Sequence, residues 1–160
     1  MDRSRRLQIA KWQGFTVIEL CVAMLFILVT TAFAIPVVTS SLNAYRLNQA
    51  VTSVSAAIQS TRYQAIATGY PYSVVFDKAG ATFQIKNDPT NVGTFVNVGN
   101  PVPFGQANWM NQSTTFVFRP GGAVQSPQAA ANGTTTMTVT YNGKTETITV
   151  SGYGRIQVTP

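Results

Sequence analysis

One carboxylate lies inside the most apolar stretch of the chain, and it offers the clearest chemistry in the sequence. Residues 15–35 are 21 residues whose only charged side chain is Glu19. A carboxylate at membrane depth costs about 2.5–3.5 kcal/mol on insertion scales, so it usually has a functional partner. The chemistry that this position favours is therefore the neutralisation of Glu19 by a cationic group.

The stretch that carries Glu19 has the length and the flanking charge of a membrane anchor. About 20 apolar residues allow a helix to cross the hydrocarbon core of a bilayer. The next cation after the stretch is Arg46, whereas four precede it, at Arg3, Arg5, Arg6 and Lys11. Because positive charge is retained in the cytoplasm, we expect a single pass through the inner (plasma) membrane, with a cytoplasmic N-terminus and a periplasmic or other extracytoplasmic head.

Three fates of this segment are consistent with the residues alone. Ala32-Phe33-Ala34 resembles the A-x-A cleavage site of a secretory signal peptide, although the apolar stretch exceeds the about 7–15 residues usual there. An uncleaved anchor is the second fate, in which Glu19 reaches the membrane interface from the helix end. The third is cleavage after Gly14, which accounts for Gly14, Phe15 and Glu19 together.

The segment from Gly14 to Leu20 reads Gly-Phe-Thr-Val-Ile-Glu-Leu and resembles the processing site of the type IV prepilins. The resemblance implies that a prepilin peptidase cleaves between Gly14 and Phe15 and that Phe15 is N-methylated. It also implies that Glu19 is the carboxylate of filament assembly. The new α-amino group is largely cationic at neutral pH and can neutralise Glu19 of a neighbouring subunit. Residues 1–14 would then be a cleaved leader, and residues 15–35 the transmembrane or filament-core half of a helix.

A second, amphipathic half of that helix is predicted over residues 36–69. Pro36 removes one helical hydrogen bond, which predicts a kink rather than an end, and type IV pilins share such a proline. Apolar residues then recur mostly every three or four positions, at Leu47, Val51, Val54, Ile58, Ala65 and Ile66. Gly69 and Pro71 end the helix. Arg62, between these apolar positions, is interpreted as a solvated side chain.

The apolar period changes to two after Pro71, which predicts an antiparallel β-sheet head over residues 70–160. Short strands are expected at residues 72–76, 82–86, 94–98, 114–118 and 153–158, and long surface loops at 87–113 and 120–133. Asn142-Gly143 is typical of a type I′ turn and predicts a hairpin over residues 135–150. Its register would pair Val139 with Glu146 and would gather threonines on a solvent-facing side.

Three further segments, in order along the chain, resemble the GspH/FimT minor pseudopilins. They are Arg62-Tyr63-Gln64-Ala65-Ile66 with Gly69, Phe118-Arg119-Pro120-Gly121-Gly122, and Ile148 to Ile156. Gly121 and Gly152 in these segments need only allow tight turns. The resemblance implies an α+β, pilin-like fold, with one long N-terminal helix packed on an antiparallel sheet, and a minor subunit of a type II secretion system or type IV pilus. Its partners would be other pseudopilins or minor pilins, the prepilin peptidase and the inner-membrane assembly platform.

DNA binding during natural transformation is the alternative function. Some FimT-type members resemble one another in a Gly-Arg-x-Arg tail, whereas the tail here is Gly154-Arg155-Ile156-Gln157, without the second arginine. Arg155, helped by Lys144 and Arg119, would neutralise about two or three phosphates, which predicts weak and salt-sensitive binding.

Composition argues against catalysis. The 160 residues include no histidine, one cysteine, Cys21, and five acidic side chains. The sequence has no cluster of metal ligands and no glycine-rich phosphate loop, so acid–base, nucleophilic and metal chemistry have little to work with. Half of the formal net charge of +6 lies in residues 1–14, and no run of cations suggests a nucleic-acid arm. We therefore expect a structural subunit with no cofactor and no metal, not an enzyme.

Overall fold

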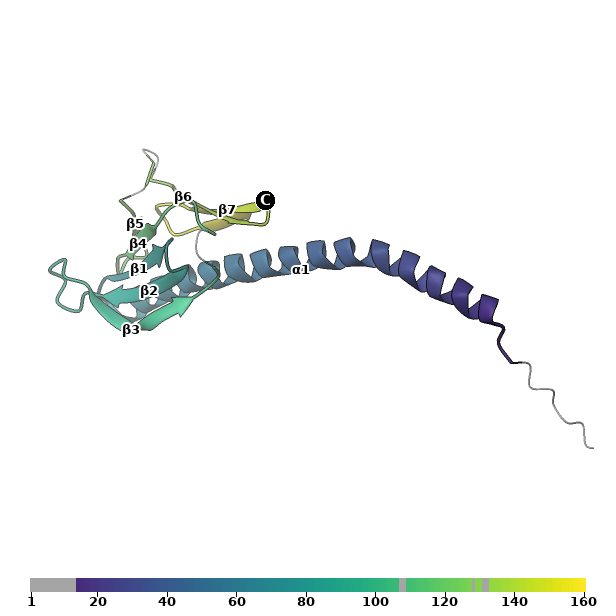
Figure 1. Cartoon of the computed structure of the whole chain (residues 1–160). Helices are drawn as coiled ribbons and strands as arrows, with labels where there is room; N and C mark the ends of the chain where they lie inside the picture. Colours follow the sequence, from purple (N-terminus) through teal and green to yellow (C-terminus); the bar gives the residue numbers. More distant parts are fainter. Residues whose placement is uncertain (1–13, 107–108, 128, 131–132) are drawn as a thin grey trace, which may run out of the picture. The chain divides into compact units, whose positions relative to one another are not determined.

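The computed structural model of the chain describes residues 14–106, 109–127, 129–130 and 133–160. The chain divides into two compact units, Met1–Ser40 and Ser41–Pro160. One helix, α1 (Val17–Thr68), begins in the first unit and ends in the second, and eight strands follow it among the described residues (Figure 1). The predicted leader lies outside the described residues except for Gly14.

The part of α1 in the second unit has one buried face. Its buried residues are Leu47, Ala50, Val51, Val54, Ala57, Ile58, Thr61 and Ala65. Their spacing of three and four matches the period of an α-helix, so the predicted amphipathic pattern is confirmed at five of its six positions. The prediction was wrong for Ile66, whose side chain is 51% exposed.

Five strands form the first sheet, in the order β3-β2-β1-β4-β5. They are β1 (Tyr72–Asp77), β2 (Thr82–Asn87), β3 (Val96–Pro103), β4 (Thr114–Phe118) and β5 (Val124–Gln125), and all neighbours are antiparallel. The strand expected at residues 94–98 begins later and continues through residues that we expected to form a loop. It does so because β3 is an edge strand, where Pro101 and Pro103 remove no hydrogen bond that the sheet needs. The loop expected over residues 120–133 likewise contains the short strand β5.

Three strands form a second sheet, in the order β6-β7-β8, so the head has two antiparallel sheets instead of one. They are β6 (Thr135–Tyr141), β7 (Lys144–Val150) and β8 (Ile156–Thr159). The predicted hairpin register is confirmed, with Val139 opposite Glu146. Asn142 and Gly143 both have positive φ angles, of 49° and 80°, as a type I′ turn requires. The last strand starts at Ile156, later than expected, because residues 151–155 form a turn.

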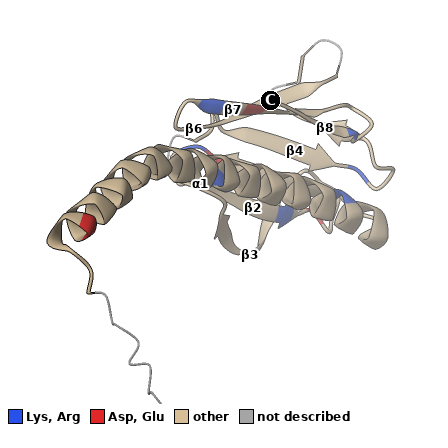
Figure 2. Ribbon diagram, turned by 90° about the vertical axis from the view of Figure 1, so that its right-hand side faces the viewer, with Lys and Arg blue, Asp and Glu red and all other residues tan. Residues whose placement is uncertain are grey.

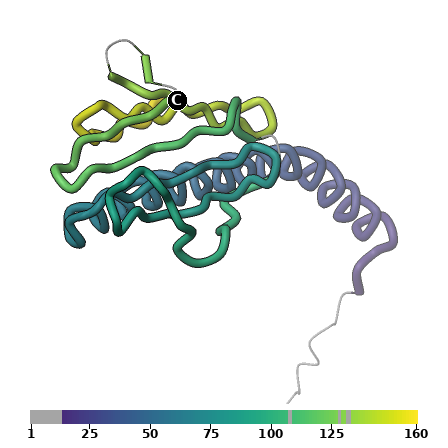
Figure 3. Tube along the Cα trace, turned by 90° about the vertical axis from the view of Figure 1, so that its left-hand side faces the viewer, coloured from purple at the N-terminus to yellow at the C-terminus, as the bar shows by residue number. Residues whose placement is uncertain are grey.

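Buried side chains of α1 and of both sheets form one core in the second unit. The largest fully buried side chains include Phe76, Phe116 and Phe118 from the five-stranded sheet, Ile148 from the other sheet, and Ile58 from α1. Figure 3 shows the corresponding part of α1 running alongside the strands. Full burial of such a side chain contributes about 1.5–3 kcal/mol, so this core is what holds the helix against the sheets.

Candidate functional site

The start of α1 places Glu19 in the first turn of the helix, directly after the predicted processing site. Gly14 and Phe15 precede the helix, and the side chain of Phe15 is 84% exposed. The hydroxyl of Thr16 accepts a hydrogen bond from the backbone N–H of Glu19 at 3.3 Å. Thr16 is thus the N-cap, and Glu19 has the position of the acid in a capping box. This cap is visible in the sequence as Thr-x-x-Glu, but our sequence analysis missed it.

The first unit exposes the apolar surface of α1. By length and composition α1 is able to cross a membrane, and its most apolar window of 18 residues has no buried position. Large side chains such as Leu28, 71% exposed, and Phe33, 73% exposed, have no core to enter within this unit. A helix that is apolar on all sides is stable in water only when something covers it, so this segment needs lipid or other helices around it.

Pro36 lies inside α1, which continues past it. The proline nitrogen carries no hydrogen and cannot donate to the carbonyl of Ala32, so one helical hydrogen bond is absent there. The hydroxyl of Thr39 donates to the carbonyl of Pro36 at 3.0 Å. The continuation of the helix agrees with the expectation that Pro36 does not end it, and the kink itself stays a prediction.

Near the C-terminal end of α1, the side chain of Arg62 joins segments that are far apart in the sequence. Its Nη1 donates a hydrogen bond to the carbonyl of Gly154 at 3.2 Å, across 92 positions of the chain. Its Nε is buried without a hydrogen-bond partner among the described residues. The interpretation of Arg62 as a solvated side chain was therefore wrong. We call Arg62, Gly122 and Gly154 the arginine junction.

The two glycines of the arginine junction leave room for the guanidinium. A Cβ on Gly154 would lie 2.7 Å from Nε of Arg62, and a Cβ on Gly122 would lie 3.4 Å from its Nη2. Both glycines also have positive φ angles, of 77° and 78°, which other residues rarely adopt. The sequence analysis singled out Gly121 and Gly152 instead, because the contact with Arg62 leaves no local signal.

The three predicted DNA-contact residues lie in two separate places. Two of them are next to the arginine junction, and the third is away from it. Arg119 and Arg155 flank Gly122 and Gly154, and the backbone N–H of Val124 donates to the carbonyl of Gly152 at 2.8 Å, which ties the two turns together. Lys144 starts β7, a strand of seven residues whose other end leads to Arg155. A strand rises about 3.3 Å per residue, so Lys144 lies about 20 Å from that end. Figure 2 shows cationic positions, in blue, next to the ends of β4 and β8 and, apart from them, on β7.

Arg119 and Arg155 are both exposed but differ in how they are held. The Nε and Nη2 atoms of Arg119 donate to the side-chain oxygen of Gln125 at 3.3 and 3.0 Å. The backbone of Arg155 closes a turn, since its N–H donates to the hydroxyl of Ser151 and its carbonyl accepts from the N–H of Ser151. Arg155 is therefore presented on an ordered turn.

Asp88 organises the loop that shares a cavity of about 330 Å³ with Arg119. Its carboxylate accepts hydrogen bonds from the N–H of Gly93 at 2.7 Å, the N–H of Val92 at 3.3 Å and the hydroxyl of Thr90 at 3.1 Å. Burial raises the pKa of this carboxyl, but these hydrogen bonds together lower it below its ordinary value of 3.8. The pKa is thus lower in the folded chain than in the unfolded one.

The depressed pKa of Asp88 predicts an acid-sensitive loop. A carboxyl of this kind stabilises the fold above its unfolded pKa, and the stabilisation is lost as the pH falls through its folded pKa. We expect Asp88→Asn to lower the unfolding temperature of the full chain at pH 7. Below about pH 4, the unfolding temperature of this variant should fall less than that of the unmodified chain. Thermal unfolding measured from pH 7 to pH 3 checks this. The control Val92→Ala, which changes an exposed side chain of the same loop and no carboxylate, should keep the acid dependence of the unmodified chain. An unchanged profile for Asp88→Asn would contradict the assignment.

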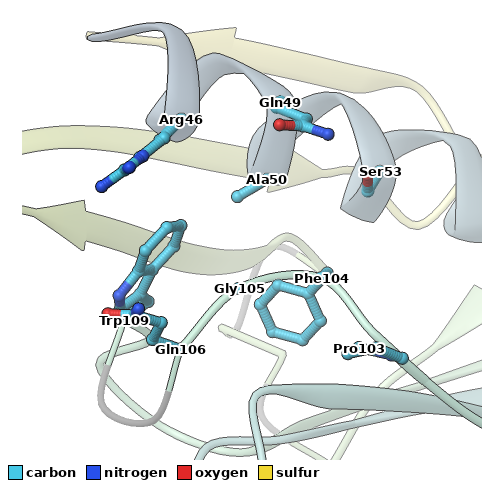
Figure 4. Close-up of a pocket in the computed structure, with 9 residues that line it drawn as sticks. All are labelled: Arg46, Gln49, Ala50, Ser53, Pro103, Phe104, Gly105, Gln106 and Trp109. Atoms are coloured by element: carbon cyan, nitrogen blue, oxygen red, sulfur yellow. The ribbon is translucent and has the colours of Figure 1, made fainter. Parts of the chain in front are cut away.

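A cavity of about 370 Å³ lies between α1 and the segment after β3 (Figure 4). Arg46, Gln49 and Ser53 face it from the helix, and Gln106 and Trp109 face it from the other side. The ring of Trp109 packs on that of Tyr141, with centroids 4.3 Å apart, while Nη1 of Arg46 donates to the Tyr141 hydroxyl at 3.0 Å. A Cβ on Gly105 would lie 2.6 Å from the Trp109 ring, so protein covers that part of the ring as well. The described residues lining the cavity include no carboxylate and no nucleophile paired with a base.

The family model described as type II transport protein GspH matches residues 50–154, more than half of the chain. The chain belongs to the GspH family. The match begins inside α1, at Ala50, and contains all three members of the arginine junction. It does not reach Gly14, Phe15 or Glu19.

This GspH-family chain has the fold of a pilin. It is similar to the crystal structure of the Pseudomonas aeruginosa (strain PAO1) type IV minor pilin FimU in space group P21, with a TM-score of 0.54, 18% sequence identity, and coverage of 73% of this chain and 90% of that one. A second crystal form of FimU, in space group P65, gives a TM-score of 0.48 at 18% identity, with coverage of 71% and 93%. At this identity the first similarity shows the fold: a long N-terminal helix on antiparallel sheets. No curated protein matches the chain.

For this member of the GspH family, the structure gives a physical reason why one helical segment and two turn segments carry the residues that resemble the family. Residues 62–66, 118–122 and 148–156 resembled the family in order, and the structure brings one residue or turn of each to the arginine junction. Sequence reasoning missed the contact between a charged residue on the helix and two glycines with positive φ. Without the fold, nothing indicated that these three positions meet.

Proposed function

We propose that the chain is a minor subunit of a pilus-like filament, in a type II secretion system or a type IV pilus, and that it assembles through the N-terminal half of α1. A single feature carries this proposal. A GspH-family head is preceded by an exposed apolar helix whose first turn holds one carboxylate, Glu19, five residues after Gly14. Such a helix is of little use to a soluble protein, whereas it suits both a bilayer and the apolar centre of a filament.

The proposed role of Glu19 depends on processing. Cleavage between Gly14 and Phe15 creates an α-amino group, which is largely cationic at neutral pH. In an apolar surrounding, an unpaired carboxylate is costly, and a cation within reach removes much of that cost. The amine of one subunit and Glu19 of its neighbour would therefore favour entry of a correctly processed subunit into the filament. N-methylation of Phe15 leaves this charge in place.

The partners follow from the same proposal. The prepilin peptidase would act at Gly14, and the inner-membrane assembly platform would move the anchored subunit out of the bilayer. Other pseudopilins or minor pilins would surround its helix. Before cleavage, the chain would sit in the inner membrane as a single-pass protein, with residues 1–14 in the cytoplasm and the head outside it. Its function would be structural instead of catalytic.

The mature N-terminus is the most direct test of processing. We expect mass spectrometry of the chain purified from membranes of cells that express its machinery to show a start at N-methylated Phe15. A start at Ile35 would mean signal-peptide cleavage after Ala34 and would overturn the proposal. A start at Met1 would mean an uncleaved anchor. The Gly14→Val variant, purified in parallel, should retain residues 1–14, because the site of cleavage then carries a bulky β-branched residue.

DNA binding is a second candidate, favoured by the positions of Arg119 and Arg155 on two turns that a backbone hydrogen bond joins. Lys144, at the other end of β7, would not join them on one short stretch of DNA. Only about two phosphates are then within reach, which predicts a salt slope near −2. The cross-linking experiment described below distinguishes this candidate from subunit contact.

A further inference from the structure

Exposed side chains adjoin the members of the arginine junction: Tyr63 follows Arg62, Ile66 lies near Gly122, and Tyr153 and Arg155 flank Gly154 in the chain. Tyr153 is 89% exposed, Tyr63 is 78% exposed and Ile66 is 51% exposed, and Arg155 lies beside Tyr153 on the same turn. We call Tyr63, Ile66, Tyr153 and Arg155 the junction patch. Large apolar and aromatic side chains that gather on a surface beside a charge mark sites of interaction. The patch is therefore a place where another molecule can dock.

The junction patch is built on backbone that is already ordered. The N–H of Gly154 donates to the carbonyl of Ser151 at 2.8 Å, and the N–H of Arg155 donates to the Ser151 hydroxyl at 3.1 Å. Arg62 then holds the carbonyl of Gly154 against the helix at 3.2 Å. Ile66, one helical turn after Arg62, packs near Gly122, where a Cβ would lie 3.5 Å from its Cδ1. A surface that is ordered before binding loses little conformational freedom when a partner docks.

The composition of the junction patch favours a protein partner over a nucleic acid. Tyrosine and arginine are enriched among the residues that dominate binding between proteins. The aliphatic side chain of Ile66 neither stacks like a base-binding aromatic ring nor contacts phosphate. Arg62 is not part of the patch, because it donates its hydrogen bond inward to Gly154. Arg155 is therefore the exposed cation of the patch. Even with Arg119 on the neighbouring turn, two cations give a salt slope of only about −2 with nucleic acid, which is too little to hold it.

The charge around the junction patch indicates what the partner carries. The described acidic side chains of the second unit are Asp77, Asp88 and Glu146. Asp88, which shares a cavity with Arg119, is 1% exposed, and its oxygens are occupied by its own loop. Glu146 lies near the other end of β7, and Asp77 lies at the end of β1 that is away from Phe118. The surface near Arg155 is thus cationic, and an acidic surface complements it.

We propose that the junction patch docks an acidic surface of another pilin-like subunit, and that Arg62 is the positioning residue that presents Tyr153 and Arg155 to it. The proposal rests on the function proposed above, in which the chain enters a filament. It adds a contact made by the head, separate from the contacts of the N-terminal helix. Because Arg62 joins the helix to the turn after β7, its loss displaces the patch without removing any of the exposed residues.

Site-specific photo-cross-linking of the full chain in cells that assemble the filament tests this contact. The photoreactive amino acid p-benzoylphenylalanine replaces Tyr153 in one version, and in a control version it replaces Val92, which is 72% exposed on the loop organised by Asp88. We expect position 153 to give an adduct with another prepilin-like subunit and position 92 to give none. Arg155→Glu and Arg62→Met, each combined with the probe at position 153, should reduce the adduct by about tenfold or more, as the loss of a dominant interface residue does.

Each other outcome overturns a defined part of the scheme. An adduct with nucleic acid, equal adducts from both positions, or no adduct from a chain that is present in filaments overturns the docking proposal. An adduct that persists in Arg155→Glu overturns the acidic partner, and one that persists in a folded Arg62→Met overturns the role of Arg62. If Arg62→Met does not accumulate, Arg155→Glu still decides the docking. Absence of the unmodified chain from filaments overturns the proposed function and this proposal with it.

Discussion

Replacing Glu19 by alanine is expected to leave membrane insertion and processing intact and to abolish entry into filaments. Alanine is less costly in a bilayer than a carboxylate, so insertion should not suffer. The hydrogen bond from the backbone N–H at position 19 to the Thr16 hydroxyl does not use the Glu19 side chain, so the helix should still begin at Val17. What disappears is the charge that, as we propose, neutralises the processed N-terminus of a neighbour.

Two variants separate the charge of Glu19 from its place in the cap. Glu19→Gln keeps the shape of the side chain and removes the charge, so it should also fail to enter filaments. Thr16→Ala keeps the charge and removes the cap, at a cost of about 1 kcal/mol in helix stability, and should enter filaments. The measurement is the amount of the chain in sheared filaments relative to the amount in membranes. Normal incorporation of Glu19→Ala would show that the carboxylate has no assembly role.

The largest effect on stability is expected from Phe116→Ala. Phe116 is fully buried on β4 and packs edge-on against Phe76, with ring centroids 6.1 Å apart and an interplanar angle of 82°. Removing a buried phenylalanine side chain costs about 3–5 kcal/mol, because apolar contact is lost and a cavity remains. The whole free energy of unfolding of a domain is about 5–15 kcal/mol, so this single change should leave the head barely stable.

Thermal unfolding of the full chain in detergent, followed by near-ultraviolet circular dichroism, measures this effect. The unfolding temperature of Phe116→Ala should fall by more than about 10 °C. Val92→Ala is the control, because its side chain is 72% exposed and its replacement should change stability by less than about 0.5 kcal/mol. A fall of Phe116→Ala no larger than that of the control would mean that the core does not depend on the packing between β1 and β4.

The hairpin of β6 and β7 was predictable from residues 135–150 alone. Its turn needs two residues with positive φ, and Asn142-Gly143 is among the few pairs that adopt them readily. Once the turn is known, counting residues outward from it gives the register of the two strands. The alternation of apolar and polar side chains along each strand then decides which side of the hairpin is buried. The division of the strands into two sheets did not follow in this way, because the strand pattern is the same whether or not the chain between Phe118 and Thr135 crosses to a new sheet.

The sequence by itself determined the candidate anchor and predicted its chemistry. The apolar length of residues 15–35, the isolated charge of Glu19 and the glycine before Phe15 are all properties of one short segment, and they need no fold to be recognised. The buried stripe of α1 was determined in the same way, up to Ala65, because an α-helix repeats every 3.6 residues wherever it packs. Ile66 continued the pattern but lies outside the core.

The tertiary structure alone decided what Arg62 does. Its partner, Gly154, is 92 positions away, and the room for its guanidinium exists only where Gly122 and Gly154 meet the end of α1. No period or motif encodes such a contact, because a charged residue on a helix is usually solvated and a glycine in a turn usually needs no further reason. The fold brings a residue of α1 and two turns into one junction, and it places the exposed side chains of Tyr153 and Arg155 next to it.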